Sequence, residues 1–184
     1  ASMGFYDRRL YARNLHAHIV LRSQAATFLE TFHIQGAAHS VTNAYGLFEG
    51  EDLVGVLTFG YHPRSKEIVL NRFCFQAGVQ VVGGASKLFE NARRDMGFKS
   101  MKTWSDNRWS TGEVYKKLGF KLSGELKQDY SYVHPNSKRR VGKQSMKKSN
   151  IGAPEDVTEY EWLQEQGWTR IYDCGKKTWG WESV

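Results

Sequence analysis

The chain has 184 residues, of which 40% are hydrophobic and 14% aromatic, and a formal net charge of +7 at pH 7. This length suits one ordinary packed domain, and only 3 prolines argue against long disordered linkers. No apolar run approaches the roughly 20 residues that span a bilayer, so we expect a cytoplasmic protein without a membrane partner. Cys74 and Cys174 lie far apart without zinc-site spacing, which predicts two reduced thiols and no metal.

The first part of the chain predicts one strand, one helix and three further strands. Apolar spacing favours a strand over residues 16–21 and a helix over 24–32. The β-rich runs 44–48 and 53–59 flank a polar turn and predict a hairpin, and residues 68–75 predict its next antiparallel neighbour.

A glycine pair precedes the best-defined helix of the sequence. Residues 85–96 have apolar side chains at helical spacing, and Gly97 stands where a C-terminal cap belongs. Gly83 and Gly84 let the backbone approach a ligand closely, and free N–H groups at the start of a helix favour an anion. The loop is therefore a candidate pyrophosphate site, and a tight turn without a ligand is the alternative.

The next part of the chain predicts two more strands around a helix. Residues 101–104 favour a short strand. Ser110 and Glu113 have capping-box spacing and predict the start of a helix that ends at Gly119. Strands are expected from residue 120 and over residues 130–133.

Two local signals mark the C-terminal part. Thr158 and Glu161 have capping-box spacing and predict a short helix that stops at Gly167. A final hairpin is expected around Gly175.

The positive charge is concentrated in one segment, residues 134–149, which we call the basic segment. It contains no acidic residue and six basic ones, which are Lys138, Arg139, Arg140, Lys143, Lys147 and Lys148. Such a cluster can neutralise several phosphates of a polyanion. A solvated, mobile loop is the alternative, because charge alone identifies no partner.

The order of the predicted elements, together with Tyr115-Lys116-Lys117-Leu118-Gly119-Phe120, resembles the GNAT superfamily of N-acetyltransferases over roughly residues 15–133. In that superfamily the fourth strand ends at a glycine loop that binds the CoA pyrophosphate, and a Tyr-x-x-Leu-Gly-Phe segment closes the helix after strand five. The resemblance implies an α/β fold with a mixed, twisted central sheet flanked by helices. It places a catalytic domain over residues 4–133 and a C-terminal extension, packed on the same domain, over residues 134–184.

The resemblance also implies a cofactor, acetyl-CoA or a related acyl-CoA. The loop departs from the usual family pattern because valines stand where Arg or Gln commonly begins it. The candidate cofactor-binding residues are Phe73, Phe75, Val82, Gly83, Gly84, Ala85, Ser86 and Lys87.

Four residues are candidates for catalysis. Tyr115 stands where the resemblance places the donor of a proton to the thiolate, and a packed aromatic is the alternative. His33 follows the first helix in the loop that usually faces the acceptor, where it can remove a proton or serve structure alone. Asp106 follows the fifth strand and is a candidate catalytic residue because of that position. The alternative is that its carboxylate only caps or fixes a loop. Tyr130 completes the set.

Several phrases also resemble the Mom-type DNA-modification proteins of bacteriophages and related domains of phage homing endonucleases. They include Phe28-Leu29-Glu30, His33-Ile34-Gln35-Gly36, Arg72-Phe73-Cys74 and the end of the chain from Glu159 to Trp181. This resemblance implies transfer of an acyl or carbamoylmethyl-type group to a base amine of phage DNA in the host cytoplasm, which protects that DNA from restriction. It implies double-stranded DNA as a partner and leaves the oligomeric state open, a homodimer included.

The candidate nucleic-acid-binding residues are Arg108, Tyr132, Lys138, Arg139, Arg140 and Lys143. Aromatic side chains near basic groups suit an unstacked base, and core packing is the alternative for them. Two other functions compete with DNA modification. One is ordinary N-acetylation of a small amine or a protein, and the other is a non-catalytic DNA-binding module related to homing-endonuclease accessory domains.

Overall fold

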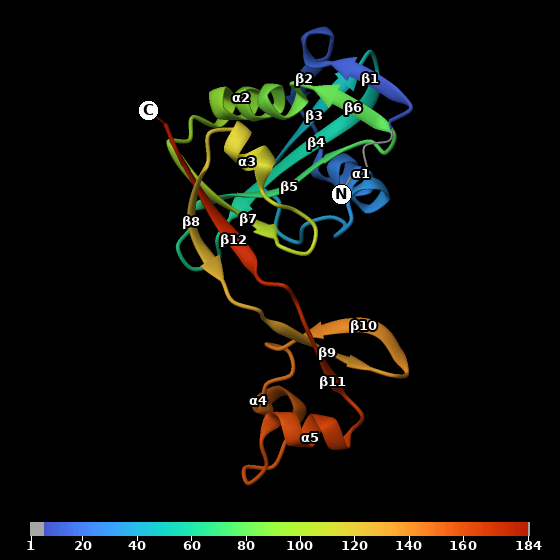
Figure 1. Ribbon diagram of the computed structural model, residues 1–184, viewed down its shortest axis with the longest axis vertical. Coiled ribbons are helices and arrows are strands. Elements are labelled where there is room, and N and C mark those ends of the chain that lie inside the picture. Colours follow the sequence, from blue (N-terminus) through green and yellow to red (C-terminus); the bar gives the residue numbers. More distant parts are fainter. Residues whose placement is uncertain (1–5, 184) are drawn as a thin grey trace. The chain divides into compact units, whose positions relative to one another are not determined.

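The computed structural model describes residues 6–183, with the side chain of Lys138 outside the description. The described chain divides into two compact units (Figure 1). The first unit holds residues up to 105, residues 109–124 and residues from 177 onward, and the second holds residues 106–108 and 125–176. This division differs from the boundary expected at residue 133: the second unit takes residues from 125 onward, and the chain returns to the first unit at residue 177.

The first unit is built on a seven-stranded sheet with the strand order β2-β3-β4-β5-β7-β12-β8. Strands β2 to β5 pair antiparallel, and β5 and β7 pair parallel, so the expected mixed sheet is confirmed. The strands are β2 His16–Ile19, β3 Asn43–Glu49, β4 Asp52–Tyr61, β5 Ile68–Phe75, β7 Ser100–Asp106, β8 Lys121–Leu126 and β12 Lys176–Glu182.

Two helices, α1 (Arg22–Phe32) and α2 (Gly84–Met96), cover different faces of this sheet (Figure 1). Ala25, Phe28 and Leu29 of α1 pack in one cluster with Ala44 and Val56 of the sheet. The apolar stripe of α2 packs in a second cluster, on the other face of the sheet. The strand residues of this second cluster alternate along the strands with those that contact α1. Both helices were predicted from their apolar spacing and are confirmed to within two residues.

Helix α3 (Glu113–Lys117) starts differently from the sequence prediction. Gly112 is the N-cap residue, at φ 85°, and Ser110 Oγ accepts from the Gly112 N–H at 3.1 Å. The capping box predicted for Ser110 and Glu113 is therefore wrong. A Cβ atom at Gly112 would overlap the ring of Trp179, so this tight start requires glycine.

A short parallel pair, β1 (Arg8–Tyr11) with β6 (Val79–Val82), was not predicted. The 3-10 turn η1 (Ala12–Asn14) follows β1. Only Leu10 is buried in β1, so its four residues carry no alternating pattern that a sequence reading can detect.

The second unit contains a three-stranded sheet with the order β10-β9-β11. Its core is a cluster of Tyr132, Met146 and Leu163. Thr158 and Glu161 form the predicted capping box at the start of α5, which is confirmed. The elements are β9 Tyr130–His134, β10 Ser137–Gly142, α4 Lys148–Ile151, α5 Glu159–Glu165 and β11 Thr169–Tyr172.

The final hairpin expected around Gly175 is wrong. Strand β11 pairs with β9, whereas β12 lies between β7 and β8 in the other sheet. Gly175 is the turn between them, at φ 74°, and the strands on its two sides pair with different partners. No helix among residues 6–183 is long and apolar enough to cross a bilayer.

Candidate functional site

The first feature of the candidate site is the separation of the parallel strands β5 and β7, which are paired only at the start of their ladder. Their parallel ladder has a single register pair, Val69 with Lys102. One residue further along, the buried Thr103 hydroxyl donates to the Leu70 carbonyl at 2.9 Å. Strand β5 continues to Phe75 without another register pair to β7. Among the described residues, β7 therefore leaves β5 without a ladder partner over residues 71–75, where the Asn71 and Phe75 carbonyls accept from the side chains of Arg72 and Cys74.

Tyr115 stands next to the point where the strands part. Its ring packs against Phe120 and Trp179, with centroids at 5.7 and 6.0 Å. Burial raises the pKa of the Tyr115 phenol, while a hydrogen bond with Thr103 and the charge of Arg72 act in the opposite direction. The phenol consequently keeps its proton at neutral pH and can donate it to an anion that forms beside it.

Arg72 connects β5 to the loop that follows α1. Its Nε donates to the Gly36 carbonyl at 3.2 Å, and its Nη1 donates to the Asn71 carbonyl at 2.9 Å. On the other side of the loop, Glu30 Oε1 accepts from the Ala37 N–H at 3.0 Å. The loop is thus held at both the helix and the sheet, and a cation lies within electrostatic range of Tyr115.

His33, which the sequence offered either as a group that removes a proton or as a structural residue, lies in this loop. Its pKa is lowered to about 4, first by burial and then by the charge of Arg72. Its Nδ1 accepts from the Gln35 N–H at 3.0 Å, which assigns the proton of the neutral ring to Nε2. A neutral ring of such low basicity favours hydrogen-bond donation over proton removal. Burial of the ring and the charge of Arg72, which is distant in sequence, are causes that local sequence patterns do not reveal.

This lowered pKa predicts an acid-sensitive fold. The unfolded chain binds the His33 proton at pH values where the folded chain does not, so the free energy of unfolding falls as pH drops from 6.5 towards about 4. His33 is only half-buried, and solvent screening limits the effect to about 1 kcal/mol. In urea unfolding at pH 7 and pH 4.5, His33→Gln is expected to reduce the difference between the two pH values by that amount. An unchanged difference would contradict the assignment.

The glycine loop leads directly into α2. Gly83 is its N-cap at φ 76°, and no side chain caps the first turn. A Cβ atom at Gly84 would lie 2.5 Å from Phe75 Cζ and 2.7 Å from Val81 Cγ1, so the backbone here lies against the end of β5. The first-turn N–H groups have no partner within the helix, as expected of an anion site.

The other predicted cofactor residues are distributed around this loop. Phe73 and Phe75 pack edge to face, with centroids at 4.9 Å. Val82 and Ser86 are exposed and Ala85 is half-buried. Lys87 instead donates to the Ala12 and Leu15 carbonyls at 2.8 and 2.5 Å, so its ammonium holds the turn after β1. Contact of these residues with a cofactor stays a prediction.

Asp106 belongs to the second unit and fixes a turn. Its carboxylate accepts from the Arg108 backbone N–H and from Arg108 Nη2, both at 3.0 Å. This is the loop-fixing role that the sequence left open as the alternative to catalysis.

Arg170 organises the aromatic residues of the second unit. Its guanidinium carbon lies 4.3 Å from the Tyr130 ring centroid and 4.2 Å from that of Tyr160. Arg170 Nε donates to the Tyr132 hydroxyl, which donates to Glu159. Tyr132 is fully buried, and burial raises its pKa to about 12. This burial is at odds with the predicted nucleic-acid contact of Tyr132. The contact of Arg170 with the Tyr130 ring shows that Tyr130 has a packing role.

The predicted basic residues of the second unit differ in their surroundings. Arg139 and Arg140 are exposed on β10. Lys143 pairs with Asp129 at 2.7 Å, which offsets its charge. The side chain of Lys138 lies outside the described residues. Within residues 6–183 there is no group of three His, Cys, Asp or Glu side chains that could hold a metal ion.

No protein-family model matches the chain, and no curated protein matches its sequence. Solved structures do match it. A Bacillus subtilis acetyltransferase solved with CoA has 14% identity and a TM-score of 0.52, covering 92% of this chain and 99% of its own. A GNAT-family acetyltransferase from Bacillus cereus has 10% identity and a TM-score of 0.51, with 92% and 98% covered.

The ribosomal-protein-S18-alanine N-acetyltransferase from Escherichia coli has 8% identity and a TM-score of 0.50, with 91% of this chain and 93% of its own covered. At these identities the likeness concerns the fold. The chain therefore has the fold of the GNAT acetyltransferases, as its sequence predicted.

Proposed function

We propose that this chain is an N-acyltransferase that transfers an acyl group from acetyl-CoA, or a related acyl-CoA, to an amine. The observation that carries the proposal is the protonated phenol of Tyr115 beside the uncovered edge of β5. The glycine loop stands close to the far end of the same strand, where Gly84 contacts Phe75. One strand thus connects an anion-binding feature to a proton donor, which is the arrangement that thioester aminolysis needs.

The residues present fit such a cofactor. The first-turn N–H groups of α2 would hold its pyrophosphate, and the backbone edge of residues 71–75 would hold its extended amide arm. When bound, an acyl-CoA supplies a thioester carbonyl that is activated towards amines. The amine nitrogen would bond to the thioester carbonyl carbon as the carbon–sulfur bond breaks. Tyr115 would give its phenolic proton to the departing thiolate sulfur, the proton of the attacking amine would pass to water, and the tyrosinate would regain a proton from water.

The test is an acetyltransferase assay with the purified full chain. Acetyl-CoA is offered with a panel of polyamines, aminoglycosides and peptides with free N-termini, and both thiol release and the acetylated product are measured. Amine-dependent thiol release with a matching product is expected. Absence of acetyl-CoA binding in calorimetry, together with no product from any amine, would refute the proposal.

A second candidate function is modification of a base amine in DNA, which the exposed Arg139 and Arg140 on β10 favour. Neutralising both arginines by Gln is then expected to weaken duplex binding and to lower its salt dependence. Nucleosides from cells that express the chain, or its Tyr115→Phe variant, are compared by mass spectrometry. A modified nucleoside present only with the wild-type chain supports this candidate. Salt-sensitive duplex binding without any modified nucleoside points to a non-catalytic binding module.

Gly84→Ala is expected to weaken both the fold and acetyl-CoA binding. The added methyl group has to displace Phe75 or Val81, and such overpacking costs about 1–3 kcal/mol. The same displacement moves the first turn of α2, so we expect acetyl-CoA affinity to fall about tenfold, which corresponds to about 1.4 kcal/mol. Calorimetric titration and urea unfolding measure the two effects. Gly124→Ala, where a Cβ meets open space, is the control and should leave affinity unchanged.

A further inference from the structure

Arg72 is a half-buried cation beside the proposed reaction centre, and it has no carboxylate partner. Among residues 6–183, its guanidinium forms no ion pair with Asp or Glu. It donates to the Gly36 and Asn71 carbonyls, which use two of its five N–H groups. Burial also lowers the pKa of Arg72, because the charged form loses hydration. A partly desolvated cation without a counter-ion gains most from an anionic ligand.

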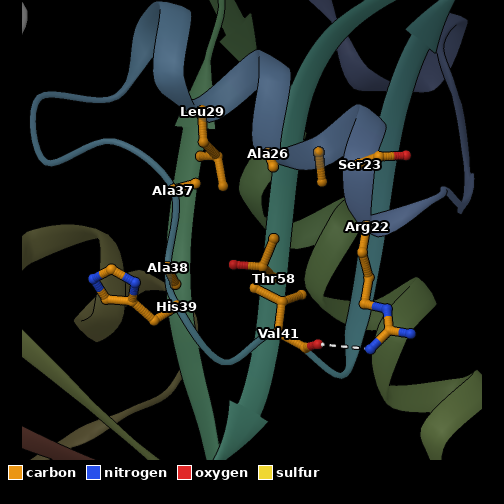
Figure 2. A pocket seen from close by; sticks show the side chains of 10 residues that line it. Arg22, Ser23, Ala26, Leu29, Ala37, Ala38, His39, Val41 and Thr58 are labelled. Atoms are coloured by element: carbon orange, nitrogen blue, oxygen red, sulfur yellow. Dashed lines mark hydrogen bonds between the residues drawn. The ribbon is translucent and has the colours of Figure 1, made fainter.

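Arg72 and Tyr115 lie on opposite faces of the sheet, and the charge of Arg72 acts on the Tyr115 phenol. Thr58 is opposite Arg72 in the β4–β5 register, and Figure 2 shows Thr58 between α1 and the segment 37–41. Residues opposite each other in a ladder share a face, so Arg72 lies on the α1 face. Tyr115 packs in the cluster that contains the apolar stripe of α2, on the other face. An amine that reaches the thioester from the side opposite the proton donor therefore meets Arg72.

The other polar groups around Arg72 also favour an anion. His33 is neutral at pH 7, because its pKa is lowered to about 4, and its Nε2–H is a hydrogen-bond donor. The Glu30 carboxylate of the same loop accepts from the Ala37 N–H and forms no ion pair with Arg72. In the described part of the chain, no carboxylate charge acts on Arg72 or on His33. These surroundings disfavour a simple ammonium ion and favour an acceptor that has a negative group next to its amine.

We propose, on the basis of the acyl transfer proposed above, that Arg72 selects an acceptor with a carboxylate on the carbon next to its amine, such as a free amino acid. The carboxylate accepts hydrogen bonds from the N–H groups of Arg72 that the two carbonyls leave available, which holds the amine close to the thioester carbon. The amine nitrogen replaces the thiol sulfur on that carbon, Tyr115 protonates the sulfur, and the amine proton passes to water. The products are an N-acyl amino acid and the free thiol.

The test compares kcat/KM of the full chain for several L-amino acids with kcat/KM for the corresponding amino acid amides, at saturating acetyl-CoA. Each pair shares its side chain and the position of its amine, and only the amide lacks the negative charge. We expect the acids to be preferred about 10- to 100-fold, which corresponds to about 1.4–2.8 kcal/mol. The less basic amine of the amide is more often unprotonated at neutral pH, so the expected preference runs against intrinsic reactivity.

Substitutions of Arg72 test whether this residue is the cause. Arg72→Gln also loses the hydrogen bond to the Gly36 carbonyl, and a loosened loop lowers the rates of both members of a pair alike. The ratio of acid to amide is therefore the decisive quantity, and it should fall to within about threefold in Arg72→Gln. Arg72→Lys keeps the charge and should restore part of the ratio. Arg64→Gln, at an exposed arginine between β4 and β5, is the control and should keep the wild-type ratio.

Binding is measured separately by NMR titration of the ¹⁵N-labelled full chain with the amino acids. Saturable shifts at residues 33–37 and 71–73 without any acetylated product would support this site and refute the proposed acyl transfer. Equal kcat/KM for acids and amides, or a preference that Arg72→Gln leaves unchanged, would overturn the role of Arg72 while acyl transfer stands. Transfer to polyamines or to DNA, with neither transfer to nor binding of any amino acid, would also overturn it.

Discussion

Tyr115→Phe is expected to lower kcat of the proposed acyl transfer about 100- to 1000-fold, within the range of general acid catalysis. The substitution removes the proton that would neutralise the departing thiolate and keeps the ring against Phe120 and Trp179. Because burial raises the pKa of the phenol, the wild-type rate should show no loss of this acid at neutral or mildly alkaline pH. Steady-state kinetics with acetyl-CoA and the best amine measure the effect.

The matched control is Tyr61→Phe, which removes the same atom from a tyrosine that is 51% exposed. It should leave kcat within about twofold, since a surface hydroxyl has little effect on the site. The KM for acetyl-CoA should change little in Tyr115→Phe, because the phenol acts on the departing group. A kcat within threefold of wild type would remove Tyr115 from the chemistry, and acetyl-CoA binding by the variant would still test the cofactor proposal separately.

Trp179→Ala is expected to cost about 3–5 kcal/mol of unfolding free energy, the largest stability effect we predict. Trp179 is 1% exposed on β12, where its Nε1 donates to the buried Ser105 hydroxyl at 2.9 Å. The substitution opens a cavity beneath Gly112 and leaves Ser105 without its donor. It therefore weakens the contact through which β12 and the start of α3 hold each other.

Urea unfolding followed by circular dichroism measures this loss. Leu122→Ala on the neighbouring strand β8 is the control, because Leu122 is 52% exposed and its truncation should cost about 0.5 kcal/mol or less. Trp179→Phe keeps most of the volume and should fall between the two. A loss below about 1 kcal/mol for Trp179→Ala would show that β12 adds little to the sheet.

The elements with strong local signals were predictable. The apolar spacing of α1 and α2, the hairpin of β3 and β4 and the run of β5 appear in the structure with bounds close to those predicted. The capping box at Thr158 was also predictable, because both of its side chains act within one helical turn. Local sequence patterns are sufficient to predict an element when the residues that stabilise it are close to one another in the sequence.

Where partners are distant in sequence, local patterns failed. β1 and β6 have too few residues to show a period, and they stabilise each other across 71 residues, Arg8 with Val79. Ser110 lost its predicted capping role because the ring of Trp179 demands glycine at residue 112. The hairpin expected at Gly175 failed because β11 and β12 each gain more pairing from another strand.

The sequence by itself determined the fold class and the order of its main elements, and it placed Tyr115 and the glycine loop on those elements. Only the tertiary structure decided how these residues are protonated and what they contact. It lowered the pKa of His33 through burial and the charge of Arg72, and it buried Tyr132. It also directed the Lys87 ammonium to the backbone carbonyl of Ala12, after β1. The reason is physical: apolar periodicity is local, whereas desolvation and hydrogen bonding depend on groups that only folding brings together.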